Sequence, residues 1–248
     1  MLSKRIIPVL LLKGEGLYKT QRYKDPKYVG DPLNAIKIFN DKEVDEICVL
    51  DIDATAKKSI NFNLIEKLAS ECFIPLSYGG GITSMADASK IFSLGVEKIV
   101  INSSNFDSLN LITQLSLKYG NQAIIASVDV KSNFFNIFTV YKHNGKENTG
   151  KKPLEFINKC IEAGAGEIFL NNIDRDGVMN GMDLKLVDEI AQGITVPLIA
   201  CGGIGNVNHI KEVFQNTKVN AIAAGSMFVF HGKHRAVLIS YPNISEII

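Results

Sequence analysis

Aspartates stand at or near the ends of several short apolar segments in this 248-residue chain. A carboxylate in such a position can act as a general acid or base on a bound substrate. Asp129 is the best catalytic candidate and Asp176 is the second, although each could instead cap a helix or pair with a lysine. Asp174 is more typical of a turn residue. The full set is Asp51, Asp53, Asp129, Asp174 and Asp176.

Small residues gather where four other apolar segments end. These residues form two pairs of segments. In the first pair, Gly80-Gly81 goes with Asn102-Ser103; in the second, Gly202-Gly203 goes with Gly225-Ser226. Glycine turns and helix starts expose the backbone N–H groups that phosphate oxygens need. One such turn could be an ordinary strand-to-helix connection, but the arrangement occurs twice. The sequence therefore predicts two phosphate sites and an elongated ligand with phosphates near both ends.

The two glycine turns belong to an internal repeat. Pro75-Leu76-x-x-x-Gly80-Gly81-Ile82 reappears 122 residues later as Pro197-Leu198-x-x-x-Gly202-Gly203-Ile204. At the same spacing, Asn102-Ser103-Ser104 corresponds to Ala224-Gly225-Ser226. A repeat of about half the chain favours one domain made of two related halves over two independent domains.

Eight short apolar runs alternate with segments of helical spacing along the chain. Continuously apolar strands that alternate with helices are typical of a parallel sheet covered on both faces, and eight of them fit a closed (β/α)₈ TIM barrel. We expect one such α/β domain over residues 1–248, with half-barrels at about 1–120 and 121–248. The predicted strands are 6–12, 46–50, 74–77, 98–101, 123–128, 167–170, 196–200 and 221–224. The predicted helices are 31–40, 63–70, 85–94, 108–119, 153–163, 184–191 and 208–216.

Three helix starts and one insertion can be predicted in more detail. Asp31, Asn63 and Asn208 are suitable N-cap residues. The segment 134–142 interrupts the alternation and indicates a small hairpin after the fifth strand. Because active sites of such barrels lie at the carboxyl ends of the strands, the aspartates and the glycine turns should meet at one mouth.

The composition excludes several classes of function. Lysine and arginine number 27 against 26 acidic residues, and no acidic or basic tail is present, so we expect no binding to nucleic acid or membranes. Four separated cysteines and no signal-like or membrane-length apolar run indicate a reduced, cytoplasmic protein. His231-x-x-His234 has no adjoining acidic ligand, so we expect no metal. Motifs of P-loops, hydrolase nucleophile elbows and dinucleotide-binding turns are absent from the sequence, and we expect no cofactor.

Seven segments in order, without large gaps between them, carry a family resemblance. They are Lys4–Pro8, Gly30–Pro32, Leu50–Ile52, Gly79–Ile82, Ile101–Ser103, Asp174–Gly177 and the Gly202-Gly203 turn. From residue 1 to about 235 the chain resembles the cyclase subunit of imidazole glycerol phosphate synthase. The resemblance implies a barrel that binds a bisphosphorylated ribulosyl carboxamide ribonucleotide. It also implies a glutaminase subunit, docked on the opposite face, that sends ammonia through the barrel.

The resemblance also implies roles for individual residues. Asp129 matches an acid-base aspartate of the fifth strand, Lys19 matches a loop lysine that folds over the substrate, and Asp176 matches an acid at the mouth. We assign Asp51 and Gly177 to substrate binding with them. Four charges match a ring at the ammonia entrance, although ordinary surface ion pairs would also explain them. The ring residues are Arg5, Glu46, Lys98 and Glu167.

The chain departs from the family at Leu11, where a second catalytic aspartate is expected from the first strand. The repeat gives the same result independently, because segment 6–13 parallels 124–131 and Leu11 is then the counterpart of Asp129. Leucine cannot carry a proton, and losing a general acid or base costs typically about 10² to 10⁴ in rate. Loop 1 also differs, with Tyr18, Arg22, Tyr23 and Tyr28.

Three functions are compatible with these residues. The first is an ammonia-using barrel subunit of a glutamine amidotransferase, similar to paralogues that support acetamidino-sugar formation for surface polysaccharides. Its partners would be a glutaminase, a phosphorylated small-molecule substrate and an ATP-dependent amidotransferase. The second is authentic imidazole glycerol phosphate synthesis in histidine biosynthesis. The third is a non-catalytic barrel that binds a phosphorylated ligand and acts as a scaffold for the glutaminase.

Overall fold

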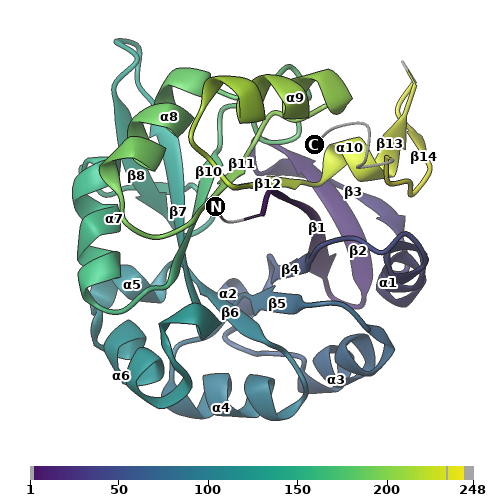
Figure 1. Cartoon of the computed structure of the whole chain (residues 1–248). Coiled ribbons are helices and arrows are strands. Elements are labelled where there is room, and N and C mark those ends of the chain that lie inside the picture. Colours follow the sequence, from purple (N-terminus) through teal and green to yellow (C-terminus); the bar gives the residue numbers. More distant parts are fainter. Residues whose placement is uncertain (1–2, 233, 243–248) are drawn as a thin grey trace.

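Eight parallel strands close into a barrel within residues 3–232 and 234–242, the part of the chain that the computed structural model describes. The first strand pairs with the second and with the last, and the fifth pairs with the sixth, so the ring has no open edge (Figure 1). The predicted (β/α)₈ barrel is confirmed. The strands are β1 (Arg5–Lys13), β4 (Ile47–Asp51), β5 (Leu76–Gly79), β6 (Lys98–Ile101), β7 (Ile124–Ser132), β10 (Glu167–Asn172), β11 (Leu198–Cys201) and β12 (Ala221–Ala224).

Helices surround the barrel, and each predicted helix forms. They are α1 (Pro32–Asp41), α3 (Phe62–Glu71), α4 (Met85–Ser93), α6 (Asn110–Tyr119), α7 (Pro153–Glu162), α8 (Leu184–Gly193) and α9 (Val207–Asn216). Short turns of helix also follow three strands, as α2 (Ala54–Lys57), α5 (Ser104–Asp107) and α10 (Ser226–Val229), and a 3₁₀ turn precedes β7 at Asn121–Ala123.

The predicted N-caps were right for one helix and wrong for two. Asp31 caps α1 through a side-chain contact with a backbone N–H in its first turn. Asn61, not Asn63, caps α3, and Asn206, not Asn208, caps α9. Each of these helices begins earlier than its apolar pattern suggested. In each cap the side-chain oxygen accepts from the backbone N–H three residues further along the chain. Asn61 Oδ1 accepts from Leu64, and Asn206 Oδ1 accepts from His209.

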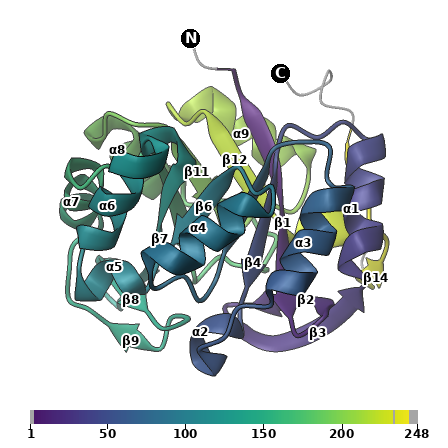
Figure 2. The ribbon, with the colours of Figure 1, turned by 90° about the horizontal axis from the view of Figure 1, so that it is seen from below.

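Two antiparallel insertions extend the barrel at its carboxyl end. The first, β2 (Gly16–Gln21) and β3 (Lys24–Gly30), continues from β1, and the sequence did not predict it. The second contains β8 (Phe138–Lys142) and β9 (Glu147–Asn148). The predicted hairpin therefore exists, but its first strand is the end of β7 rather than part of 134–142. Figure 2 shows both insertions at the end of the barrel away from the amino terminus. A small ribbon, β13 (Phe230–His231) with β14 (Ala236–Val237), follows α10.

The barrel interior is an apolar cluster that is separate from the core beneath the helices. Alternate residues of a buried parallel strand face the interior and the helices, so both sets are apolar. All four cysteines are free, as expected, and two of them lie in this interior cluster. The interior cluster comprises Ile7, Val9, Cys48, Val100, Ile125, Phe169, Ile199, Cys201, Ala221 and Ala223.

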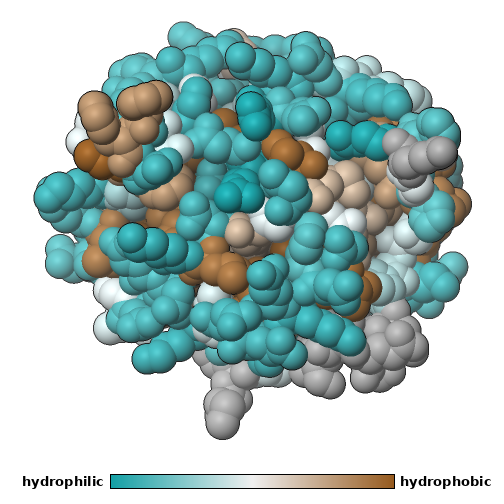
Figure 3. All heavy atoms as spheres, turned by 90° about the horizontal axis from the view of Figure 1, so that it is seen from above, coloured by the Kyte–Doolittle hydropathy of each residue, from teal (hydrophilic) through white to brown (hydrophobic). Residues whose placement is uncertain are grey.

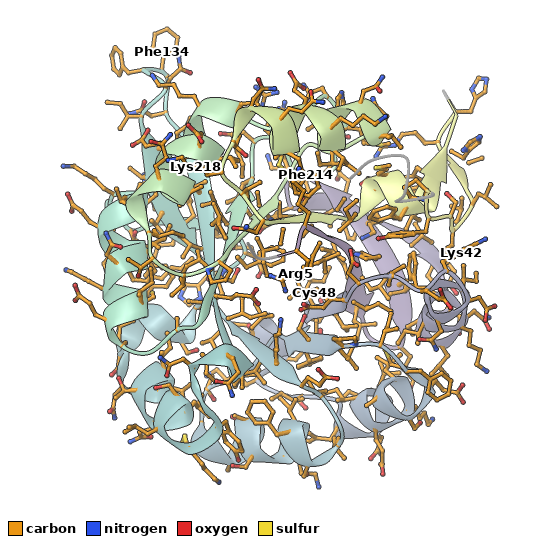
Figure 4. The ribbon with its side chains drawn as sticks, viewed as in Figure 1. Arg5, Lys42, Cys48, Phe134, Phe214 and Lys218 are labelled. Carbon is orange, nitrogen blue, oxygen red and sulfur yellow. The ribbon has the colours of Figure 1, made fainter. Side chains whose placement is uncertain are left out.

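The face of the molecule drawn in Figure 3 is largely hydrophilic, with apolar residues gathered in several areas between the hydrophilic ones. An exposed exception is the β7–β8 turn, where Phe134 is 94% exposed and points away from the barrel (Figure 4). None of the helices in the described ranges is long and apolar enough to cross a membrane.

Candidate active site at the barrel mouth

A cavity of about 410 Å³ opens at the carboxyl ends of the barrel strands. The structure brings to its wall every residue that the sequence analysis assigned to catalysis or to substrate binding. These residues are Lys19, Asp51, Gly80, Gly81, Asn102, Ser103, Asp129, Asp176, Gly177, Gly202, Gly203, Gly225 and Ser226. Their chemical roles stay predictions.

Asp129 lies on β7 and is only 5% exposed. Its Oδ1 accepts a hydrogen bond from the Tyr23 hydroxyl at 2.6 Å, and its Oδ2 accepts one from Asn102 Nδ2 at 2.9 Å. Burial raises the pKa of Asp129 to about 6, against the two hydrogen bonds, which favour the ionised form. A carboxylate with this pKa is mostly ionised at neutral pH and can still accept a proton readily, which suits a general base.

Asp176 and Lys19 form the charged part of the same mouth. Burial raises the pKa of Asp176 to about 6, although the Lys19 cation and a 3.3 Å hydrogen bond from Thr20 Oγ1 oppose the shift. Burial lowers the pKa of Lys19 to about 8, and Asp176 opposes that shift. The Lys19 ammonium donates to the carbonyl oxygen of Val9. A lysine held in this way is a positive charge placed inside the mouth by the β2–β3 hairpin.

Asp51 and Asp174 have structural partners. Asp51 Oδ1 accepts from the backbone N–H groups of Asp53 at 2.9 Å and Ala54 at 3.0 Å, which orders the turn after β4. Burial raises the pKa of Asp51, and those two bonds act in the opposite direction. Asp174 Oδ2 accepts from both the backbone and the hydroxyl of Ser132, at 2.8 and 2.9 Å. It fixes the end of β7, and Asp174 itself lies in the turn that follows β10.

The repeated glycine turns need glycine for two reasons. Gly80 has φ +121° and Gly203 has φ +111°, a region that residues with a side chain rarely adopt. A Cβ on Gly80 would lie 2.4 Å from the carbonyl oxygen of Asp51, and one on Gly203 would lie 2.1 Å from that of Gly181. At Gly225 the obstacle would be Lys19 Nζ, at 2.3 Å. The backbone at these turns therefore forms the cavity wall directly.

We expect Gly203→Ala to lower the free energy of unfolding by about 2 kcal/mol or more, because the added methyl meets backbone in a strained conformation. Urea denaturation followed by circular dichroism measures this. Gly14→Ala is the control, since Gly14 also has a positive φ, +61°, but nothing lies within 4 Å of its added Cβ. Equal losses in the two variants would contradict the close approach.

At the other end of the barrel, four charged residues form a closed ring of ion pairs. Arg5 contacts Glu46 at 2.9 Å and also Glu167, and Lys98 contacts Glu46 at 2.9 Å and Glu167 at 3.0 Å. Glu46 and Glu167 are only 2% and 6% exposed, unlike the carboxylates of ordinary surface pairs. Figure 4 shows Arg5 near the barrel axis.

The ring carboxylates hold their cations firmly. Burial alone would lower the pKa of Arg5, but Glu167 and Glu46 outweigh it and the net pKa is raised. Burial would likewise lower the pKa of Lys98, but Glu46 and Glu167 outweigh it and the net pKa is raised. One ring atom, Glu46 Oε1, is buried and makes no hydrogen bond within the described residues.

Two further residues of the mouth, Asn171 and Tyr23, have no role among the sequence-based predictions. Asn171, at the end of β10, is 6% exposed, and its Nδ2 donates to the Tyr23 hydroxyl at 2.7 Å. Tyr23 was recognised only as a departure of loop 1. A signal for Asn171 existed, because it is a polar residue directly after the predicted strand 167–170. Leu11 lines the cavity, as its place at the end of β1 requires.

The second insertion also covers part of the mouth. Asn144 Nδ2 donates to the carbonyl oxygen of Ile52 at 3.0 Å, and the His143 N–H donates to Ser103 Oγ at 3.3 Å. A Cβ on Gly145 would lie 3.2 Å from the Tyr23 ring, so the two insertions meet above the cavity. The described residues contain no group of three or more His, Cys, Asp and Glu side chains placed to hold a metal ion.

The fold and the site together define a (β/α)₈ barrel with an acid-lined, glycine-walled mouth and an ion-pair ring at the other end. Residues 5–235 match the histidine biosynthesis protein family, and the chain belongs to it.

Relatives place the chain among the imidazole glycerol phosphate synthase HisF subunits of this family. It is 52% identical over 248 residues to a Pseudomonas aeruginosa protein provisionally named imidazole glycerol phosphate synthase subunit hisF2, covering 100% of this chain and 99% of the relative. It is 46% identical over 245 residues to a provisionally named HisF subunit of Leptospira interrogans, covering 98% and 96%. It is 40% identical over 230 residues to the HisF subunit of Bacillus cereus, covering 92% and 91%.

Proposed function

We propose that this chain is the barrel subunit of a glutamine amidotransferase and uses ammonia on a phosphorylated substrate at the mouth. The observation that carries the proposal is the pairing of two sites on one axis. The ring of Arg5, Glu46, Lys98 and Glu167 closes one end, and the cavity with Asp129 opens at the other. The apolar interior cluster lies between them and offers few partners to a charged species, so neutral ammonia would be the species transferred.

In this proposal, different residues of the mouth bind the substrate and transfer protons. The Gly80-Gly81 and Gly202-Gly203 turns, with Ser103 and Ser226, bind two phosphate groups of an elongated ligand. Lys19 supplies a positive charge beside Gly225. Asp129 acts as the base that removes a proton as ammonia adds to the acceptor, and Asp176 is the second acid-base group.

For the acceptor, we propose amidination of a surface sugar, together with an ATP-dependent amidotransferase. Leu11 supports this reading, since the mouth lacks the carboxylate that imidazole ring closure would use from β1. The similarity to the Bacillus cereus HisF subunit favours the alternative, imidazole glycerol phosphate synthesis. A barrel that only binds a phosphorylated ligand and supports a glutaminase is a further alternative, which Leu11 also permits.

The partner tests the proposal directly. A HisH-like glutaminase should dock on the face that carries the ring, over roughly 800 Å² per side. Co-expression of the two chains should give a heterodimer on size exclusion, and the barrel should raise glutaminase activity. A barrel that stays alone, with a glutaminase indifferent to its presence, would remove the amidotransferase assignment.

Two exposed phenylalanines provide a matched pair of variants for this experiment. Phe73, 83% exposed, precedes β5 and therefore lies on the ring face, whereas Phe134, 94% exposed, lies beyond the mouth end of β7. We expect Phe73→Asp to weaken the heterodimer about 10-fold or more, because aromatic residues at interfaces carry much of the binding free energy. Phe134→Asp should leave it unchanged. Isothermal titration calorimetry measures both, and the reverse order would place the glutaminase at the mouth.

A further inference from the structure

The turn between β2 and β3 has an unusual conformation for its sequence. Gln21 pairs with Lys24, so Arg22 and Tyr23 form a two-residue hairpin turn. Both have positive φ values, 53° and 61°. Turns of this type favour Asn-Gly, because residues with larger side chains are strained there. Local preference therefore does not explain the turn, and contacts with the rest of the barrel must hold it.

Those contacts are made with the mouth. The Arg22 N–H donates to the carbonyl oxygen of Asp176 at 2.9 Å, and its Nε donates to that of Asp174 at 3.1 Å. The Tyr23 hydroxyl donates to Asp129 Oδ1 at 2.6 Å and accepts from Asn171 Nδ2 at 2.7 Å. The hydroxyl thus has a donor on one side and an acceptor on the other, and the strained turn carries it into the cavity.

Asp129 is the group on which this hydroxyl acts. The polar groups around the carboxylate come from three directions: Tyr23 from the hairpin turn, Asn102 from the end of β6, and Asp176 from the segment after β10. The hydrogen bonds from Tyr23 and Asn102 favour the ionised carboxylate, whereas burial and the charge of Asp176 disfavour it. Leu11, which lines the same cavity, can contribute no hydrogen bond.

We propose that Tyr23 is a positioning residue for Asp129: in the docked β2–β3 hairpin its hydroxyl orients the buried carboxylate and stabilises the negative charge there. The effect on turnover rests on the proposed function, but the contact between Tyr23 and Asp129 can be measured without any substrate.

The test is the carboxyl titration of Asp129 by carbon-13 NMR in the full chain, with Asp129→Asn used to assign the signal. The wild type should titrate near pH 6. Tyr23→Phe should raise this pKa by about one unit, because one hydrogen bond to the ionised form is lost while the site stays buried. Tyr28→Phe is the control, since Tyr28 lies on the same hairpin, is 57% exposed, and should leave the titration unchanged.

The direction of the shift separates the outcomes. If Tyr23 were only a latch, Tyr23→Phe would release the hairpin, hydrate Asp129 and lower its pKa. A lowered or unchanged pKa would therefore overturn the proposal. Amide hydrogen exchange of residues 16–30 provides a second measurement, because protection equal to that of the wild type shows that the hairpin stays docked in Tyr23→Phe. With that protection preserved, a raised pKa of Asp129 reports the loss of the hydroxyl alone.

Activity distinguishes this inference from the proposed function. In a working amidotransferase complex, the acidic limb of the pH–rate profile of Tyr23→Phe should move to higher pH, by the same amount as the pKa of Asp129 rises. A raised Asp129 pKa in a chain that never uses ammonia would leave the positioning role intact and overturn the amidotransferase instead.

Discussion

Leu11→Asp should raise the ammonia-dependent conversion of the bisphosphorylated ribulosyl carboxamide ribonucleotide from near background by about 10²-fold or more, since a general acid or base contributes about 10² to 10⁴ in rate. The substitution returns a carboxylate to the end of β1, in a mouth that retains Asp129, Lys19 and both glycine turns. Steady-state turnover of the purified chain with ammonium salts measures it.

Leu50→Asp is the matched control, because Leu50 pairs with Leu11 in the neighbouring strand and lines the same cavity. It should stay at background, and so should Leu11→Asp combined with Asp129→Asn. Wild-type turnover of about 1 s⁻¹ or more, an ordinary enzyme rate, would instead assign the chain to histidine biosynthesis. In that case another carboxylate of the mouth, Asp51 or Asp176, must replace the missing one.

Lys98→Met should lower the free energy of unfolding by about 3 kcal/mol, because removing one partner of a buried ion pair leaves charge without compensation. Lys98 is the cation that joins Glu46 to Glu167 on one side of the ring, and its loss leaves both carboxylates dependent on Arg5. Chemical denaturation at pH 7 measures the change.

Lys37→Met is the control for the ring, since the Lys37–Glu71 pair is exposed and spans 3.4 Å. Its loss should cost under about 1 kcal/mol. The effect of Lys98 should also depend on pH. The folded-state pKa lies above the ordinary 10.5, so the stabilisation is complete below pH 10.5 and is lost as pH rises through the folded value. A difference between wild type and Lys98→Met that persists well above that pH would contradict the charge mechanism.

The sequence by itself determined the barrel and the ends at which its sites lie. Apolar runs alternating with helical segments leave a parallel, two-sided sheet as the structure that buries them all. Glycines recurring at Gly80 and Gly202 marked turns that residues with a side chain cannot form. A charge at the start of a strand or an acid at its end is placed by topology alone, which is why Arg5 and Asp129 could be assigned to opposite ends.

The tertiary structure decided the pKa values and the ion-pair partners of these charged residues. The pKa of Asp129 depends on burial and on Tyr23, which is 106 residues away in the chain. The ring forms because strand register brings Arg5 to Glu167, 162 residues apart. The β2–β3 hairpin left no usable local signal, since Arg22 and Tyr23 disfavour the turn that they adopt. Such features depend on free energies summed over contacts between distant segments, which local sequence patterns do not contain.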